Sequence, residues 1–266
     1  MMKFYEFIMR NLFKFPIIIG IVSFIRFIYF TKIRKNFKTL YPLDTETISK
    51  RETKDFKNLK ELSFSKGDQV AALNTNLHHT ISPFKNMFYN ISQRFNGQRS
   101  TMLVSPLKSI DFINIKNTKI LSVGPRIESE IFNLVGHGFR LKNIEAIDLQ
   151  SYSKLIKLGD MLDIPFENNH FDVVICGWVL SYTNKIKEAV NELVRVTKDR
   201  GFICIGISDK DSKLTTASLS SSQEIINYFG DSLKLVYFKY HPGDINIKTK
   251  QQLKSFRSVI VVEIKK

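Results

Sequence analysis

The 266-residue chain is poor in acidic residues. It contains 25 Asp and Glu against 40 Lys and Arg, which gives a formal net charge of +15. A surplus of this size is compatible with nucleic acid, an anionic membrane surface or an anionic substrate as partner. The imbalance is steepest at the amino terminus, where the first forty residues hold eight Lys or Arg and a single acid, Glu6.

Cysteine is also scarce, and the two present, Cys176 and Cys204, both fall inside apolar runs that resemble central strands. We therefore expect two buried, reduced thiols, no disulfide framework and a reducing compartment. No Cys/His spacing is typical of a zinc site. The adjacent His78 and His79 would point in different directions on a helix, so we predict no metal.

The one long apolar run covers residues 12–30, LFKFPIIIGIVSFIRFIYF, and no small-residue cleavage site follows it. Lys14 and Arg26 interrupt it, and Pro16 and Gly20 weaken a soluble helix but are tolerated in membranes. Three interpretations stay open: a helix lying in the membrane interface, a single span of about 20 residues, or an apolar helix packed on the domain or a partner. The basic flanks suit the first two, since they would meet anionic headgroups.

The next part of the chain is polar and resembles a connector. Residues 32–60 are charged, and a turn is expected near Tyr41. Apolar residues at helical spacing predict two short helices within 65–96, which would cap the sheet or its site. Residues 97–110 are expected to be a loop. The predicted organisation is a membrane-associating segment (1–40), a connector with a helical cap (41–110) and a catalytic domain (111–266).

Short apolar runs alternate with helical or turn-rich segments from residue 119 onward. The expected strands are 119–123, 144–148, 155–158, 171–176 and 201–206, and the expected helices are 128–135, 184–198 and 221–229. This alternation predicts a Rossmann-like, doubly wound α/β sheet that is mostly parallel. The link after Asp148 is too short for a crossover helix, so a loop is expected there.

Two further strands are expected at the carboxyl terminus, at 233–240 and 255–264. Their short polar connection, with Pro242-Gly243, predicts an antiparallel hairpin at the sheet edge. A turn at 199–201 should end the long helix before the fifth strand.

Ligands of such sheets bind beyond the carboxyl ends of the strands, near the switch point. Gly124, Asp148, Asp160 and the residues after Ile175 all lie at the carboxyl ends of predicted strands. Because these ends meet at one edge, the sequence predicts a single site there.

The order of these residues resembles the class I S-adenosylmethionine-dependent methyltransferases, in the small-molecule, methyltransferase type 11-like branch. The resemblance covers residues 119–208 and is most specific over 159–206, GDMLDIPFENNHFDVVICGWVLSYTNKIKEAVNELVRVTKDRGFICIG. The terminal hairpin is similar to the antiparallel final strand of that family. The resemblance implies a methyltransferase with S-adenosylmethionine as cofactor.

The resemblance also implies roles for individual residues. Asp148 would accept the ribose hydroxyls, and Asp160 the adenine amine, with Met161 beside the ring. Gly124 would allow close approach of the backbone to the cofactor. Trp178 would either stack on a substrate or fill the core. The remaining expected contacts, by position alone, are Ser122, Pro125, Leu149, Gly159, Cys176 and Gly177.

The first loop departs from the family pattern. Ser122 stands where the family usually has Asp, and Arg126 and Glu128 stand where it usually has glycine. Glu128 could accept the amino group of the cofactor and Arg126 could pair with its carboxylate. Alternatively, Arg126 and Glu128 form a structural ion pair with each other.

The leading functional hypothesis is methyl transfer to a small-molecule or lipid- or glycan-linked acceptor at the cytoplasmic face of a membrane. Tyr182 is the best-placed candidate for a base, with a packing role as the alternative. One rival is a domain that binds the cofactor without turnover, motivated by the altered loop. A nucleic-acid methyltransferase is disfavoured, because the Asn/Asp-Pro-Pro-Tyr type of motif does not follow Ile175.

Overall fold

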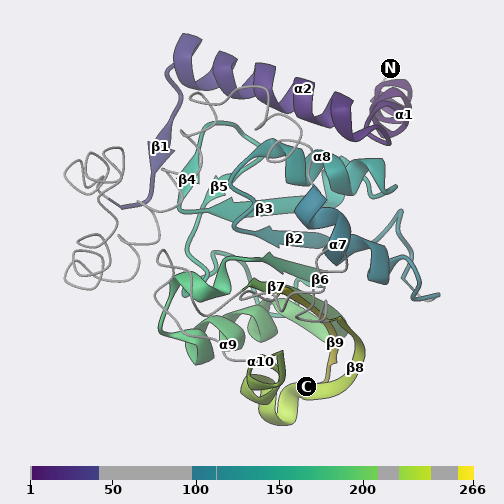
Figure 1. Ribbon diagram of the computed structural model, residues 1–266, viewed down its shortest axis with the longest axis vertical. Coiled ribbons are helices and arrows are strands. Elements are labelled where there is room, and N and C mark those ends of the chain that lie inside the picture. Colours follow the sequence, from purple (N-terminus) through teal and green to yellow (C-terminus); the bar gives the residue numbers. More distant parts are fainter. Residues whose placement is uncertain (1, 42–97, 112, 209–221, 241–256) are drawn as a thin grey trace, which may run out of the picture.

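The computed structural model describes residues 2–41, 98–111, 113–208, 222–240 and 257–266 (Figure 1). The predicted cap helices at 65–96, the two adjacent histidines and the loop at 209–220 lie outside these residues.

A seven-stranded sheet forms the centre of the molecule, in the order β5-β3-β2-β6-β7-β9-β8. Five neighbouring strands, β5 to β7 in this order, run parallel, and β9 pairs antiparallel with both β7 and β8. This confirms the mostly parallel α/β sheet with an antiparallel terminal hairpin. The strands are β2 (Ile120–Val123), β3 (Ile144–Asp148), β5 (Lys157–Leu158), β6 (Phe171–Gly177), β7 (Thr197–Ser208), β8 (Leu233–Tyr240) and β9 (Arg257–Ile264).

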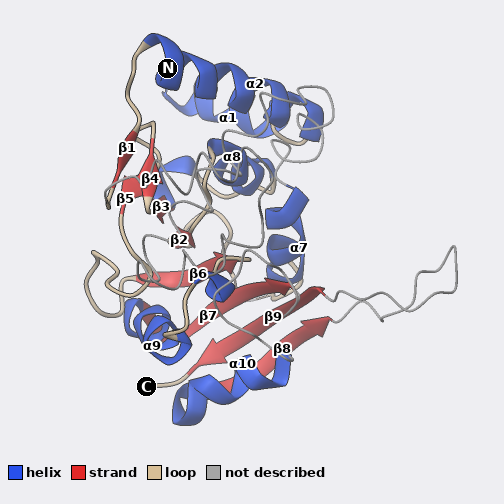
Figure 2. Cartoon of the chain, turned by 60° about the vertical axis from the view of Figure 1, so that its left-hand side comes forward, coloured by secondary structure: helices blue, strands red, loops and turns tan. Residues whose placement is uncertain are grey.

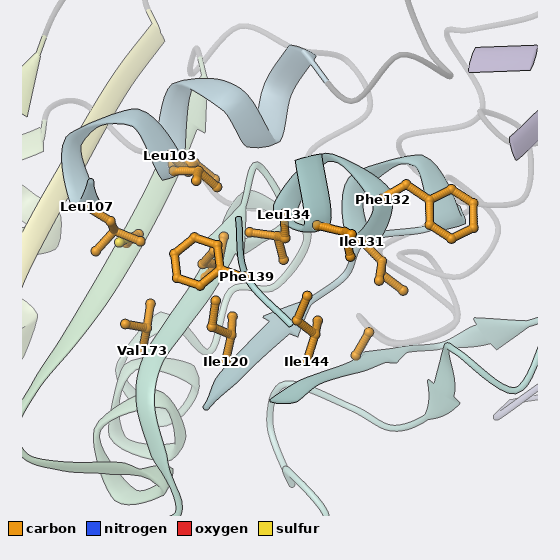
Figure 3. Packing of buried hydrophobic residues seen from close by; sticks show 14 of the residues in the cluster. Leu103, Leu107, Ile120, Ile131, Phe132, Leu134, Phe139, Ile144 and Val173 are labelled. Carbon is orange, nitrogen blue, oxygen red and sulfur yellow. The ribbon is translucent and has the colours of Figure 1, made fainter. Parts of the chain in front are cut away.

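Apolar side chains alternate between the two faces of the sheet, and each face is covered by helices. On one face, α7 (Gln98–Leu107) and α8 (Glu128–Gly136) pack over Ile120 and Val173 (Figure 3). On the other, α9 (Ile186–Val196) and α10 (Ser222–Phe229) cover Leu121 and Val174. Consecutive strand residues therefore belong to different cores, as a doubly wound sheet requires.

The amino-terminal segment packs on the outside of α8 (Figures 1 and 2). It forms α1 (Met2–Leu12), α2 (Pro16–Ile28) and a π-helical turn η1 (Tyr29–Ile33), followed by the two-residue strand β1 (Lys38–Thr39). The predicted helical extension is confirmed, but the apolar run at 12–30 is not one helix. The break before Pro16 separates α1 from α2, because proline suits the first turn of a helix and not its interior.

Two further boundaries differ from the prediction. The expected loop at 97–110 is largely the helix α7, whose Leu103 and Leu107 are buried one turn apart against the sheet. Tertiary burial of this apolar pair overrides the Ser, Thr and Pro content that favoured a loop. Pro106 lies in the last turn of α7.

The turn at 199–201 does not separate α9 from the next strand. The helix ends at Val196 and β7 begins at Thr197, so Asp199, Arg200 and Gly201 lie inside β7. Arg200 has a φ of 58°, and the pairing with β6 shifts register nearby. The turn residues therefore form an irregularity within the strand. At the other end of the sheet, β9 lies between β7 and β8, so only β8 forms the edge.

Between β3 and β5 there is no crossover helix in this described stretch, as predicted. The chain instead makes the short strand β4 (Gln150–Ser151), which pairs antiparallel with β1. The amino-terminal segment therefore pairs with the chain that follows β3.

Candidate functional site

The loop after β2 has the tight backbone geometry of a ligand-binding turn. Gly124 has a φ of +69°, and its N–H donates to the carbonyl of Ile147 in β3 over 2.8 Å. A Cβ placed at Gly124 would lie 2.4 Å from the side chain of Val179. Both the conformation and the contact exclude a side chain at this position.

Arg126, two residues further on, is also left-handed, with a φ of 60°. The loop thus has a left-handed backbone conformation, which favours glycine, at a position that arginine occupies. The N–H of Arg126 donates to Oδ2 of Asp148 over 2.9 Å. The altered loop therefore still closes onto the end of β3.

Asp148 is buried at the end of β3, with 2% of its surface exposed. Its Oδ1 accepts the N–H of Gln150 over 3.1 Å, and its Oδ2 accepts that of Arg126. Burial raises the pKa of Asp148 to about 6, and these backbone donors and the Arg126 charge oppose that rise. The backbone of Leu149 also donates to this carboxylate, so Asp148 is held in place by the loop after β2 and by the residues that follow it.

Asp160 lies at the next strand end, after the buried Gly159. Its Oδ1 accepts the N–H of Leu162 over 3.0 Å, and its Oδ2 accepts the hydroxyl of Tyr41 over 2.7 Å. Burial raises the pKa of Tyr41, and the hydrogen bond to Asp160 and its negative charge raise it further. The hydroxyl of Tyr41 therefore stays protonated and donates. Tyr41 therefore fixes the orientation of the Asp160 carboxylate.

Tyr41 reaches this position because the chain before it is pinned to the sheet domain. Lys38 and Thr39 pair with Ser151 and Gln150, and the N–H of Leu40 donates to the carbonyl of Leu149 over 2.8 Å. We call residues 38–41 the strap. The strap lies against residues 149–151, which follow Asp148, and its last residue contacts the Asp160 carboxylate.

Glu128 begins α8 and is fully buried. Its carboxylate is held by Arg26 of α2, with Nε to Oε2 at 2.6 Å and Nη2 to Oε1 at 2.9 Å. The predicted alternative of an ion pair between Arg126 and Glu128 is thus replaced by one between Arg26 and Glu128. The hydroxyl of Tyr152 accepts the N–H of Glu128 over 2.8 Å.

The residues after β6 are packed into the interior. Trp178 has a φ of 58° and 5% exposure, and its backbone N–H donates to the carbonyl of Gly206 over 2.8 Å. A Cβ at Gly206 would lie 2.8 Å from the indole ring, so the ring occupies that space. Of the two predicted roles for Trp178, the structure supports core filling.

Two other predicted positions near β6 are also enclosed. Burial raises the pKa of the Cys176 thiol to about 12, and its side chain faces the core, which confirms the predicted burial. Cys204 is likewise buried and free. Tyr182 is half-buried in the 3₁₀ turn η4 (Leu180–Tyr182) and packs against the α9 core. This packing agrees with the alternative role predicted for Tyr182.

The predicted site residues fall into two groups. One group lies at the carboxyl ends of β2, β3 and β5: Gly124, Pro125, Arg126, Asp148, Leu149, Gly159, Asp160 and Met161. The other group has side chains enclosed in the sheet: Ser122, Cys176 and Trp178. Gly177 is half-buried at the end of β6. Among the described residues no group of three metal-ligating side chains occurs. Arg26, Tyr41 and Tyr152 were not predicted from the sequence, because their contacts with Glu128 and Asp160 join residues 102, 119 and 24 positions apart and leave no local pattern.

The strand order, the antiparallel β9 between β7 and β8, and the two carboxylates at neighbouring strand ends define a class I methyltransferase fold, whose cofactor is S-adenosylmethionine. The "Methyltransferase domain" family model matches residues 138–205. The central segment of the chain is therefore similar to this methyltransferase domain family. The matched region runs from the end of α8 to β7 and includes Asp148 and Asp160.

Curated relatives are similar over the same core. An uncharacterized protein of Methanocaldococcus jannaschii, MJ1123, is 32% identical over 108 residues, which cover 39% of this chain and 53% of that protein. The demethylmenaquinone methyltransferase of Symbiobacterium thermophilum is 37% identical over 59 residues, or 22% of this chain and 24% of that enzyme. The chain thus spans between a quarter and about half of these relatives.

Solved structures are similar at low sequence identity. PH0226 protein from Pyrococcus horikoshii has a TM-score of 0.47 and 13% identity, covering 65% of this chain and 93% of that one. The N-methyltransferase NodS from Bradyrhizobium japonicum, solved with S-adenosyl-L-homocysteine, has a TM-score of 0.45 and 14% identity, covering 67% and 92%.

Proposed function

We propose that this chain is an S-adenosylmethionine-dependent methyltransferase that acts on a lipid- or glycan-linked or small-molecule acceptor at the cytoplasmic face of a membrane. The observation that carries the methyltransferase part is the meeting of Gly124, Asp148 and Asp160 at one sheet edge, within and next to the family match. The alternative is a domain that binds the cofactor without turnover.

The residues at this edge fit the proposed cofactor. At Gly124 a side chain would clash with Val179, so only glycine keeps the tight turn of the loop after β2. The buried carboxylate of Asp148 is a charged acceptor that suits ribose hydroxyls, and that of Asp160 suits an amine. When bound, S-adenosylmethionine supplies a methyl group already activated by the sulfonium. The protein then needs mainly to orient the partners and exclude water.

The altered loop supports a specific division of roles within the proposal. The guanidinium of Arg126 belongs to the loop that closes on Asp148, and we assign it to the carboxylate of the cofactor. Glu128 is already bound by Arg26. An amino group that approached Glu128 would share its carboxylate with Arg26, so this second contact stays a prediction.

The membrane part of the proposal is supported by the exposed face of the amino-terminal helices. Ile17, Ile21, Ile25, Tyr29 and Ile33, spaced by four, are 41–68% exposed, and Phe7, Ile8, Leu12 and Phe15 add to them. We call this set the apolar stripe. Residues 16–33 have a mean hydropathy of 1.7, yet only 22% of them are buried. Core helices of soluble proteins can be equally long and apolar, but they are mostly buried.

The packing of α2 favours a helix that lies flat over one that spans. Its inner side buries Ile19, Ser23 and Phe27, and Arg26 holds Glu128 of α8. A spanning helix would have to leave α8, and the buried carboxylate of Glu128 would then lose its ion pair with Arg26. An interfacial helix keeps these contacts and places only the apolar stripe in lipid.

A matched pair of substitutions tests the membrane part. Ile21 is 47% exposed on the apolar stripe and Leu235 is 49% exposed on the edge strand β8. Ile21→Glu should lower binding to neutral phosphatidylcholine vesicles about tenfold, since it places a charge in lipid, and Leu235→Glu should leave it unchanged. Equal binding by all three proteins, or none by the parent, would remove the membrane part. Deleting residues 1–31 is a poorer test, because it would uncover the buried side of α8.

The test of turnover uses labelled S-adenosylmethionine with membrane lipid extracts and their water-soluble counterparts. Label transfer into the lipid fraction is the expected result. Tight cofactor binding with no transfer to any fraction would favour the domain without turnover.

A further inference from the structure

A cavity of about 540 Å³ lies beside the apolar stripe, between α2 with η1 and the chain after β4. It is lined by Arg26, Phe30, Arg34, Asn36, Lys154 and Leu155. Three of these side chains are cationic and none is acidic. We propose that this cavity binds the phosphate group of an anionic lipid whose chain lies along the apolar stripe. The inference rests on the membrane part of the proposed function.

The position of the cavity relative to the stripe carries the first step. Arg26, Phe30 and Arg34 are spaced by four, and each directly follows a member of the stripe, Ile25, Tyr29 and Ile33. On a helix such rows lie next to each other, about a quarter of a turn apart. An amphiphile can therefore place its chain on one row and its headgroup on the next.

The charge of the cavity gives the ligand class. Arg26 is neutralised by Glu128, so Arg34 and Lys154 supply the uncompensated charge of the lining. Both are exposed side chains that can reach a ligand. Guanidinium and ammonium groups that line one cavity can donate charge-assisted hydrogen bonds to phosphate oxygens. Phe30 and Leu155 add an apolar wall, which suits the first carbons of a lipid.

The walls of the cavity are held by contacts within the domain. The amide of Asn36 donates to the carbonyl of Tyr152 over 3.1 Å, and the guanidinium of Arg26 lies 5.1 Å from the ring of Phe30. The cavity therefore joins the amino-terminal segment to the segment that follows Asp148. Through Arg26 and Glu128 it is also one contact from the loop of Arg126. A lipid bound there would lie next to the candidate cofactor site.

The test uses a short-chain phosphatidic acid that stays monomeric in solution, titrated by calorimetry into the full chain. Binding should be saturable and one-to-one. Arg34→Gln/Lys154→Gln should weaken it at least about tenfold. The control Lys35→Gln/Lys142→Gln removes the same charge from exposed lysines outside the cavity and should change it less than about twofold.

The possible results separate the sources of the phosphate. Equal weakening in both double variants would mean diffuse electrostatic attraction, and would overturn the cavity. Inorganic phosphate binding as tightly as the short-chain lipid would overturn the lipid assignment. Binding of the parent to neutral vesicles without binding of phosphatidic acid would remove this site alone, whereas loss of vesicle binding altogether would remove the proposed membrane part.

Discussion

Arg26 and Glu128, which are 102 residues apart in the chain, form a two-point ion pair between α2 and the start of α8. Glu128 is fully buried, whereas the Arg26 side chain is 37% exposed. The pair joins the apolar amino-terminal helix to the loop that closes on Asp148. The surface proposed to face the membrane and the surface proposed to bind the cofactor thus share one contact.

Arg26→Ala should destabilise the protein, because it leaves the Glu128 carboxylate buried without its cation. Breaking a fully buried pair costs about 3–5 kcal/mol, and the partial exposure of Arg26 reduces our expectation to about 2–3 kcal/mol. Urea unfolding measures this difference. Arg26→Met/Glu128→Gln should recover most of the loss, and a double variant as unstable as the single one would argue against the pair as the cause.

Tyr41→Phe tests the strap. The hydroxyl of Tyr41 holds the Asp160 carboxylate, so its removal should weaken S-adenosylhomocysteine binding by about 0.5–1.5 kcal/mol. Inosyl analogues should lose less, because their base lacks the amine that Asp160 would accept. Tighter binding in the variant would mean instead that Tyr41 competes with the adenine for Asp160.

Arg126→Gly separates backbone strain from side-chain function. The left-handed φ of 60° is unfavourable for arginine, so glycine should raise the unfolding free energy by about 1 kcal/mol. The same change should lower cofactor affinity if the guanidinium binds the cofactor carboxylate. Arg126→Ala keeps the strain and loses the charge, so it should lower affinity without raising stability. A glycine variant with lower stability would contradict the strain argument.

Asp148 should make cofactor affinity depend on pH. The ionised carboxylate is the better acceptor of ribose hydroxyls, and burial sets its pKa at about 6. Affinity for S-adenosylhomocysteine should therefore fall as the pH drops through about 6 and level off above it. Asp148→Asn cannot ionise and should give weaker binding with a flat profile. An unchanged pH profile in Asp148→Asn would assign the titration to another group.

The sheet could be read from the sequence because its signals are local. Apolar runs bounded by turns, such as Phe171–Gly177, predict buried parallel strands. Asp148 and Asp160 lie at the carboxyl ends of two other such runs, β3 and β5. The missing helix after Asp148 was predictable from chain length alone. Helix α7 was not, since only burial of Leu103 and Leu107 stabilises it.

The amino-terminal contacts could not be predicted from local patterns. Arg26 resembled an interruption of an apolar run, and Tyr41 resembled part of a turn. Their partners, Glu128 and Asp160, are 102 and 119 residues away, and a side-chain contact at that distance leaves no periodic signal. The same contacts make the strap and α2 part of the candidate site.

The most direct test of the central claim is a calorimetric titration of S-adenosylhomocysteine into the parent protein and into Asp148→Ala. We expect one-to-one binding by the parent, weakened by about 1.5–3 kcal/mol in the variant, as for a lost hydrogen bond to a charged group, with the variant still folded by circular dichroism. No binding by the parent, or equal affinity in a folded Asp148→Ala variant, would contradict a methyltransferase cofactor site at the end of β3.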